Sequence, residues 1–326
     1  MKQGLADRAA GALLGMAAGD ALGAGYEFGP ALSAATEVEL IGGGSFGWAP
    51  GEWTDDTQMA VPLLEAAERA ATSGTALTDH LDHVARRWVD WAVTAADVGN
   101  QTRSVISTVR HSGDVSAAAL SQASHALHAL TGRTAGNGSL MRTAPVALAY
   151  LSDPAGLASA AREVSSLTHW DDDAGDACVL WCLAIRHAML HGAFDLAGGL
   201  DALPEERRTT WAARIAEAEK ARPRDFPENG WVVHALQGAW SAITTTKVPD
   251  GDPPLHLRLA LENAVRGGGD TDTVAAIAGQ LLGARWGASA VPMGWTAKLH
   301  GWPGLTGQAL AERGAALAGG ASRLRA

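Results

Sequence analysis

The chain has 326 residues, of which 47% are hydrophobic and 18% are charged, so it can bury a large core and is not a disordered protein. With a formal net charge of −10, most of its surface would repel nucleic acid and an anionic membrane, so neither partner is expected. Two cysteines are too few for a disulfide framework, which fits a reducing compartment, and Cys178 and Cys182 are expected to be buried apolar residues.

The first element in chain order is a helix over Leu5–Leu22, and we do not interpret it as a signal peptide. Residues 9–19 are rich in Ala and Gly, are only weakly apolar and are followed directly by Asp20. The longest apolar stretch, residues 177–190, is interrupted by Arg186 and is shorter than the ~20 residues that a membrane span needs. We therefore expect a cytoplasmic protein with no membrane-spanning segment.

Further helices follow along the whole chain. Ala and Leu dominate these segments, β-branched residues rarely occur in runs, and no stretch alternates like a strand. We expect Pro62 to kink the second helix or to mark where its first turns are irregular. The expected ranges after the first helix are Thr54–Ala71, Leu81–Ala96, Gln101–His111, Ser116–Leu130, Leu140–Leu151, Ala155–Leu167, Ala174–His191, Glu205–Ala221, Val232–Thr245, Leu255–Val265, Thr271–Arg285 and Thr306–Ala318. The sequence predicts an all-α fold, with a single compact orthogonal multi-helix domain over residues 1–326.

Two loops and two acidic segments interrupt this regular pattern. The first loop, from Phe28 to Trp53, is long enough inside a compact domain to suggest a function, and the second, residues 222–231, contains Pro. Residues 54–57 (Thr-Asp-Asp-Thr) and 270–273 (Asp-Thr-Asp-Thr) each open a helix. One interpretation is that these acids cap their helices and complement the helix dipoles, for about 0.3–1 kcal/mol each.

The other interpretation is that the two acidic segments converge on one space. Residues 267–269 are all Gly and permit a close backbone approach just before the second segment. At ~4 Å and an effective dielectric of about 20, each like-charge pair costs about 4 kcal/mol, so bound cations or strongly raised pKa values are required. Asp and Thr oxygens favour Mg²⁺, Mn²⁺ or Ca²⁺ over Zn²⁺. No HExxH motif accompanies His187 and His191, so no zinc site is expected.

Six motifs, in this order along residues 9–295, carry a resemblance to a known family. They are Gly19–Gly23 with Glu27, Trp53–Thr57, Asp97–Asn100, Gly136–Arg142, Thr168–His169 and Gly268–Thr273. The chain resembles the ADP-ribosylglycohydrolase family, which includes the dinitrogenase reductase-activating glycohydrolases. The resemblance implies an all-helical fold with a binuclear Mg²⁺ or Mn²⁺ centre in a cleft, and cleavage of the bond between ADP-ribose and an acceptor.

The resemblance also implies roles for individual residues. The implied metal ligands are Thr54, Asp55, Asp56, Asp270, Asp272 and Thr273. The implied substrate contacts are Asn100, Gly136, Asn137, Gly138, Ser139, His169 and Trp231; residues 136–139 would hold the phosphates and distal ribose, and Trp231 would stack on adenine. Glu27 matches a carboxylate on a mobile loop, and Asp97 and Asn100 match a motif facing the scissile bond. The catalytic candidates are Asp97, Glu27, Asp55 and Asp272.

The expected function is therefore removal of ADP-ribose from arginine, with two divalent cations as cofactors and an ADP-ribosylated protein or small molecule as partner. A carboxylate at Asp97 suits a guanidinium, which pairs with it through parallel hydrogen bonds. Three alternatives stay open: hydrolysis of O-linked ADP-ribose (on serine, in poly-ADP-ribose or in O-acetyl-ADP-ribose), nucleotide phosphatase activity, or a non-catalytic ADP-ribose-binding or structural role. Residues 170–173 replace a Pro-containing turn of relatives, which leaves the acceptor preference open.

Overall fold

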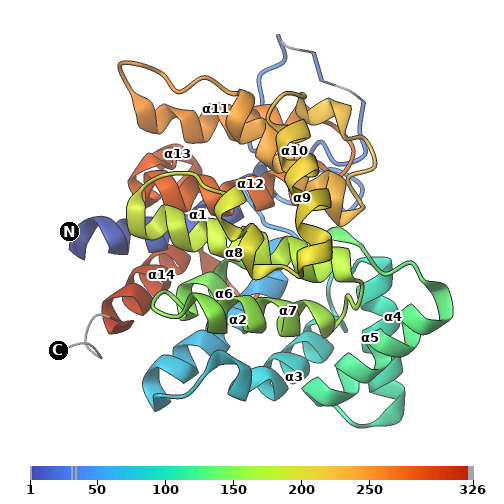
Figure 1. Cartoon of the computed structure of the whole chain (residues 1–326). Helices are drawn as coiled ribbons and strands as arrows, with labels where there is room; N and C mark the ends of the chain where they lie inside the picture. Colours follow the sequence, from blue (N-terminus) through green and yellow to red (C-terminus); the bar gives the residue numbers. More distant parts are fainter. Residues whose placement is uncertain (1, 31, 34, 322–326) are drawn as a thin grey trace.

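A computed structural model describes residues 2–30, 32–33 and 35–321, which are mostly helical (Figure 1). The α-helices are α1 (Lys2–Gly23), α2 (Asp55–Ser73), α3 (Leu81–Trp91), α4 (Asn100–Ser112), α5 (Ala117–Thr131), α6 (Ala144–Ala149), α7 (Pro154–Ser166), α8 (Asp172–His191), α9 (Glu205–Ala218), α10 (Val232–Thr245), α11 (His256–Val265), α12 (Thr271–Trp286), α13 (Met293–Thr296) and α14 (Gly307–Ala321). Short 3-10 turns are η1 (Leu77–His80), η2 (Asn137–Ser139), η3 (Ala197–Ala202), η4 (Pro223–Asp225), η5 (Pro253–Leu255) and η6 (Ala288–Ala290). The prediction of an all-α fold is confirmed.

The structure differs from the predicted elements in several places, and the short helix α13 was not predicted at all. Residues 140–143 form a turn and α6 begins only at Ala144, because Pro145 fixes the first turn of that helix. Helix α3 ends at Trp91 rather than at residue 96, and its last turn tightens as the amide of Val93 bonds to the carbonyl of Asp90. The strands β1 (His300–Gly301) and β2 (Leu305–Thr306) pair antiparallel; at two residues each they are too short to produce an alternating pattern.

Helix α1 packs against α12 backbone to backbone and antiparallel to it. Glycines recur every fourth residue from 11 to 23 and share one face of α1. A Cβ on Gly15 would lie 2.3 Å from the carbonyl oxygen of Gly279, and one on Gly19 would lie 2.0 Å from that of Ala275. No other residue type fits at these positions. The contact therefore fixes the end of α1 beside the start of α12, where an acidic segment lies.

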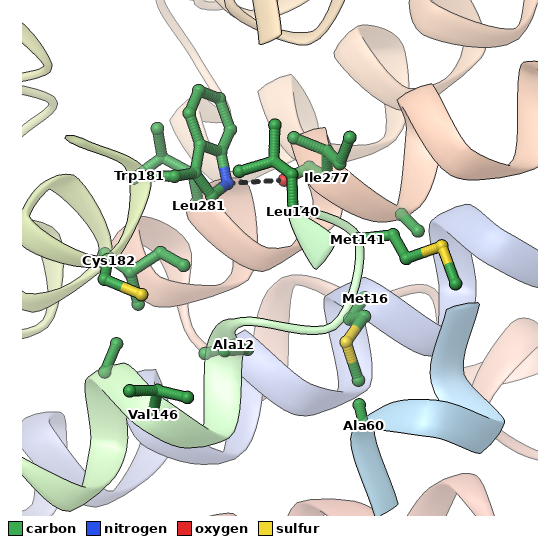
Figure 2. Close-up of a cluster of buried hydrophobic side chains, with 14 of the residues drawn as sticks. Ala12, Met16, Ala60, Leu140, Met141, Val146, Trp181, Cys182, Ile277 and Leu281 are labelled. Carbon is green, nitrogen blue, oxygen red and sulfur yellow. Dashed lines mark hydrogen bonds between the residues drawn. The ribbon is translucent and has the colours of Figure 1, made fainter. Parts of the chain in front are cut away.

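The core behind this contact is apolar and joins helices from distant parts of the chain. Figure 2 shows Met16 of α1 with Met141 and with Ile277 of α12, and the indole Nε1 of Trp181 donates to the carbonyl oxygen of Ile277 over 3.1 Å. Cys182 lies in the same cluster, and it and Cys178 are fully buried and form no disulfide. The expectation that both cysteines are buried apolar residues is confirmed.

Helix α2 is continuous from Asp55 to Ser73 and runs through Pro62. Residues 28–30, 32–33 and 35–53 of the predicted long loop contain no helix. The loop begins beside the start of α12, where the amide of Phe28 donates to the carbonyl oxygen of Gly269 over 2.8 Å. None of the helices described here combines the length and apolar character needed to cross a bilayer.

Candidate active site

The first turns of α2 and α12 bring their acidic side chains together. Carboxylate oxygens of Asp20, Asp56 and Asp272 lie within 4.8 Å of one another, and so do those of Glu27, Asp270 and Asp272. The two groups share Asp272 and draw on α1, α2, the start of α12 and the turn that follows α1, which carries Glu27. Segments that are distant in the chain therefore form one continuous acidic cluster.

Helix capping does not account for these side chains. Thr54 and Asp270 occupy the N-cap positions of α2 and α12, but neither side chain accepts a capping hydrogen bond. Instead, the hydroxyls of Thr54 and Thr273 both donate to Oδ2 of Asp56, over 3.1 and 3.3 Å. Asp272 Oδ1 accepts from the amide of Thr273 over 2.9 Å. Most of these groups therefore face one another across the two helices rather than the helix amides.

Asp20 supports the start of α2, a role that the sequence analysis did not assign. It is fully buried, and its Oδ1 accepts from the amide of Thr54 over 2.8 Å. Its Oδ2 accepts from the amide and the hydroxyl of Thr57, over 2.9 and 2.6 Å. Asp20 is the only charged residue between positions 9 and 26. An isolated acid on an otherwise apolar helix is a signal that identifies such a residue from sequence.

Two asparagines support the start of α12. The amide of Asp270 donates to Asn229 Oδ1 over 3.0 Å, and Asn229 Nδ2 donates to the carbonyl oxygen of Gly268 over 2.8 Å. Asn137 Nδ2 donates to Asp270 Oδ2 over 2.7 Å and to the carbonyl oxygen of Asn229 over 2.8 Å. Gly269 has φ +73, and a Cβ there would lie 2.5 Å from Asn229 Oδ1. The loop predicted to hold phosphates thus contacts the acidic cluster directly.

Burial raises the pKa values of several carboxyl groups at the site, and repulsion between them adds to most of these shifts. Burial, followed by the charges of Asp270, Asp97 and Asp20, raises the pKa of Glu27 to about 8. Burial also raises the pKa of Asp20 to about 6, against its hydrogen bonds to Thr57 and Thr54. The same cause, with neighbouring carboxylates, holds the pKa values of three further residues well above the usual range: Asp55, Asp56 and Asp272.

The donor set fits hard divalent cations. Asp56 Oδ1 and Glu27 Oε2 are buried and have no hydrogen-bond partner among the described residues, so each has lone pairs free for a cation. The surrounding ligands are carboxylate and hydroxyl oxygens, the donor type that Mg²⁺, Mn²⁺ and Ca²⁺ prefer. The side chains present therefore fit the metal centre that the sequence predicts.

A cavity of about 440 Å³ opens onto the acidic cluster. The residues that line it and were singled out from sequence are Glu27, Asp55, Asp97, Asn100, Gly136, Asn137, Gly138, His169, Asp270, Asp272 and Thr273. Those that the sequence analysis gave no role are Phe28, Phe46, Val98, Gly99, Gln101, Thr102, Met141 and Gly230. Neither Lys nor Arg is among the lining residues. Nothing in the local sequence of Phe46 or Met141 identifies them, because the fold alone brings them to the cavity.

Four residues singled out from sequence do not line the cavity. Thr54 and Asp56 are buried beneath its acidic floor. Ser139 is fully buried, and its hydroxyl bonds to that of Ser165 over 2.9 Å. The ring of Trp231 lies beside His234, with centroids 5.1 Å apart. Neither side chain is among the residues that line the cavity, so their predicted contacts with ADP-ribose stay predictions.

Asp97 and His169 lie on different parts of the cavity lining. Asp97 is half-buried just before α4, and burial raises its pKa, with Asp270 adding to the shift and Arg103 opposing it. His169 is buried, and burial and the charge of Arg142 hold its pKa well below the usual range. The ionisable groups of the lining are therefore all carboxyl groups apart from His169, whose ring is neutral.

Comparison with known proteins identifies relatives over the full length of the chain. A family model described as ADP-ribosylglycohydrolase matches residues 1–324. The chain is 31% identical over 301 residues to the ADP-ribosyl-dinitrogen reductase glycohydrolase of Rhodospirillum rubrum, covering 90% of each protein. It is 30% identical over 311 residues to the ADP-ribosylarginine hydrolase Tri1 of Pseudomonas putida, covering 90% of this chain and 74% of that protein. A solved structure described as an ADP-ribosylglycohydrolase-related protein complex superposes with a TM-score of 0.72 at 30% identity, covering 99% of this chain and 100% of that one.

Proposed function

Because the chain belongs to the ADP-ribosylglycohydrolase family, we propose that it is a divalent-cation-dependent hydrolase that removes ADP-ribose from modified arginine. The two relatives described above are named for arginine-linked ADP-ribose and for ADP-ribosylated dinitrogen reductase, which supports this acceptor. The proposal places the whole chain in one catalytic domain, acting in the cytoplasm on an ADP-ribosylated protein or small molecule.

The observation that carries the proposal is the charge of the cavity. Its lining includes five carboxylates and neither Lys nor Arg. The pyrophosphate of ADP-ribose would be repelled there unless cations neutralise the acids, so substrate and cations are expected to bind together. The residues proposed to hold two cations, Mg²⁺ or Mn²⁺, are Thr54, Asp55, Asp56, Asp270, Asp272 and Thr273. When bound, such ions orient substrate oxygens and lower the pKa of water.

The rest of the cavity suits the uncharged and phosphate-bearing parts of the substrate. A volume of about 440 Å³ lies in the range of small-molecule sites. Gly136 and Gly138 line it without side chains, and the turn that begins at Asn137 has first amides without partners inside the turn. These residues and His169 are proposed to hold the pyrophosphate, and Asn100 to contact the ribose or the acceptor.

Two carboxylates are proposed to act at the scissile bond. Asp97 lines the cavity outside the proposed cation ligands, where it can pair with a guanidinium through two parallel hydrogen bonds and orient the leaving group. Glu27 has a pKa of about 8, so in the cation-free protein its carboxyl group holds a proton near neutral pH. A group that titrates near the working pH is suited to proton transfer, and Glu27 is therefore the candidate for that step.

A substrate panel tests the reaction class and the acceptor together. We expect release of ADP-ribose from ADP-ribosylarginine with Mg²⁺ or Mn²⁺ and none in excess EDTA, measured by chromatography of the product. ADP-ribosylated serine and O-acetyl-ADP-ribose are the comparison substrates. Full activity in EDTA would contradict the cation-dependent mechanism, and faster cleavage of the serine linkage would contradict the arginine assignment while leaving the family unchanged.

Asp97→Asn tests the pairing with the acceptor, because it keeps the shape of the side chain and removes its charge. On ADP-ribosylarginine we expect a loss of roughly 2–5 kcal/mol of transition-state stabilisation, visible in kcat as well as in KM. The loss on an O-linked substrate should be smaller, since an ether oxygen donates no hydrogen bonds. Asp90→Asn, an exposed change on α3, is the matched control. A wild-type rate for Asp97→Asn on the arginine substrate would refute this role.

A further inference from the structure

Arg142 is a buried cation that the proposed mechanism does not use. Its side chain is fully buried, burial lowers its pKa to about 9, and its Nε has no hydrogen-bond partner among the described residues. The guanidinium lies over the ring of Trp88, 4.1 Å from the centroid, and Nη2 donates to Thr168 Oγ1 over 2.7 Å. Among the described residues it has no carboxylate as a hydrogen-bond partner, although the charge of Asp55 helps to keep it protonated. Burying a charge on neutral partners costs folding free energy, which is a reason to consider a role beyond stability.

Hydrogen-bond chemistry fixes the protons from Arg142 towards the cavity. A guanidinium only donates, so Thr168 Oγ1 accepts from Arg142. The other partner of Oγ1 is Nδ1 of His169, 2.7 Å away. If Nδ1 carried a proton, Oγ1 would accept twice and its own buried proton would lack an acceptor. The hydroxyl therefore donates to Nδ1, and in the neutral ring the imidazole proton lies on Nε2.

The Nε2 side of His169 faces two glycines of the cavity wall. A Cβ on Gly136 would lie 3.2 Å from Nε2, and one on Gly138 would also lie 3.2 Å from it. Nε2 has no hydrogen-bond partner among the described residues, although the side chain is only 3% exposed. The absence of side chains at both glycines leaves this N–H open to a ligand in the cavity. It is a neutral donor, in a cavity whose ionisable groups are otherwise acidic.

We propose that Arg142 and Thr168 are positioning residues that hold His169 as a neutral Nε2–H donor for an anionic oxygen in the cavity. The assignment of that oxygen to the pyrophosphate of ADP-ribose rests on the proposed function; the state of His169 does not. The guanidinium of Arg142 would act through the hydroxyl of Thr168. Because the guanidinium donates to Oγ1, the hydroxyl must donate to Nδ1 of His169. A structural role alone would instead require only packing and would be indifferent to where the imidazole proton lies.

Nitrogen-15 spectra of the histidine side chains test the state of His169 without any ligand. The signals are assigned by their loss in His169→Gln. In the ligand-free wild type we expect one tautomer, with Nε2 protonated and Nδ1 unprotonated and accepting a hydrogen bond. In Thr168→Val, the Nδ1 signal should move towards that of a nitrogen without a hydrogen bond, whereas Thr168→Ser should keep the wild-type position. A proton on Nδ1 in the wild type would overturn the proposal.

Calorimetric titration with ADP-ribose, in the presence of Mg²⁺, tests the consequence for binding. Thr168→Val removes the hydrogen bond from the Thr168 hydroxyl to His169 Nδ1, and we expect it to bind ADP-ribose roughly tenfold more weakly. Thr168→Ser keeps this hydrogen bond and should bind within about twofold of wild type. Thr134→Val is the matched control, because Thr134 Oγ1 also lies against a histidine Nδ1, that of His128, at 2.5 Å and away from Arg142. It should bind like wild type.

The two measurements separate the failure of this inference from that of the proposed function. If wild type does not bind ADP-ribose, the proposed function is contradicted, and the spectra still decide the state of His169. If a folded Thr168→Val binds ADP-ribose like wild type, or if Thr168→Ser loses as much affinity as Thr168→Val, the positioning role is overturned. Should Thr168→Val fail to fold, the wild-type spectrum still decides which nitrogen of His169 carries the proton. Thr168→Ser, which keeps the hydroxyl, must then still bind within about twofold of wild type, and a larger loss overturns the positioning role.

Discussion

The starts of α2 and α12 have almost the same residues but different supports. The α2 start is held by Asp20, a charged, fully buried residue of a helix that is fixed by backbone contact to α12. The α12 start is held by the neutral amides of Asn137 and Asn229, which belong to loops. It also follows glycines with positive φ at 268 and 269. One start therefore depends on the helical core, the other on the wall of the substrate cavity.

From this difference we expect one half of the site to govern stability and the other half to respond to ligand binding. Asp20 directs both oxygens to Thr54 and Thr57, neither of which lines the cavity, although its neighbour in the acidic cluster, Asp272, does. Asn137 lines the cavity and donates to Asp270, so a ligand that moves Asn137 also moves an acid of the cluster. Stability is thus expected to depend on the α2 side and ligand response on the α12 side. Substitutions on the two sides test this division, and the loss of a carboxylate should affect both halves equally.

The largest effect is expected when either start loses a carboxylate. Asp55→Ala on α2 and Asp272→Ala on α12 should each reduce turnover below detection, because each removes a proposed cation ligand. Far-UV circular dichroism should stay close to wild type. Removing one like charge relieves repulsion, so the cation-free variants should be at least as stable as wild type in urea. Full turnover in either variant would break the equivalence of the two starts.

The next effect is a loss of stability confined to the α2 side. In Asp20→Asn, an amide NH₂ replaces one of two oxygens that accept from three donors, so at least one buried donor loses its partner. We expect the free energy of unfolding to fall by about 1–3 kcal/mol in urea titrations. Asp82→Asn is the control, because Asp82 accepts one amide, that of Ala117, at an exposed site. Equal losses in both variants would contradict the special role of Asp20.

Sequence patterns predicted the helical fold and most of the cavity lining, but not the supports. Helical periodicity and capping signals depend on neighbours in the chain, which is why most helices were located. The partners of Asp20, Asn229 and Arg142 are far away in sequence, and only the packed structure reveals them. Ser139 shows the converse: its motif is typical of a ligand loop, but the fold turns its hydroxyl into the core. An isolated charge within an apolar segment, as at Asp20 and Arg142, is the sequence signal that could have identified these buried residues.

A smaller effect, on ligand binding rather than stability, is expected from the α12 side. Asn137→Ala removes a donor to Asp270 and one to the carbonyl oxygen of Asn229. Hydrogen-bond partners of metal ligands typically contribute 10–100-fold to affinity, so we expect Mg²⁺ and ADP-ribose affinities to fall together by about tenfold in calorimetry. Asn263→Ala on α11, which loses hydrogen bonds to the hydroxyls of Thr245 and Thr246 outside the cavity lining, is the control. Unchanged Mg²⁺ affinity in Asn137→Ala would remove the proposed link between cavity wall and cation site.

The smallest effect is a pH dependence that distinguishes Asp20, which supports α2, from the cavity-lining Glu27 in the cation-free protein. The pKa of Asp20 is raised to about 6 and that of Glu27 to about 8, so the folded chain holds more protons than the unfolded one until each folded pKa is passed. The free energy of unfolding in EDTA should therefore fall as pH rises. The part of this fall that Asp20 causes should end just above pH 6, whereas the part that Glu27 causes should continue to about pH 8. Glu27→Gln should flatten the decline between those values, and saturating Mg²⁺ should reduce it in the wild type, since the cation replaces the protons.

Urea unfolding at several pH values measures both slopes. A stability that rises with pH in EDTA would show that the acids of the cluster ionise freely, and would contradict the repulsion on which the cation assignment depends.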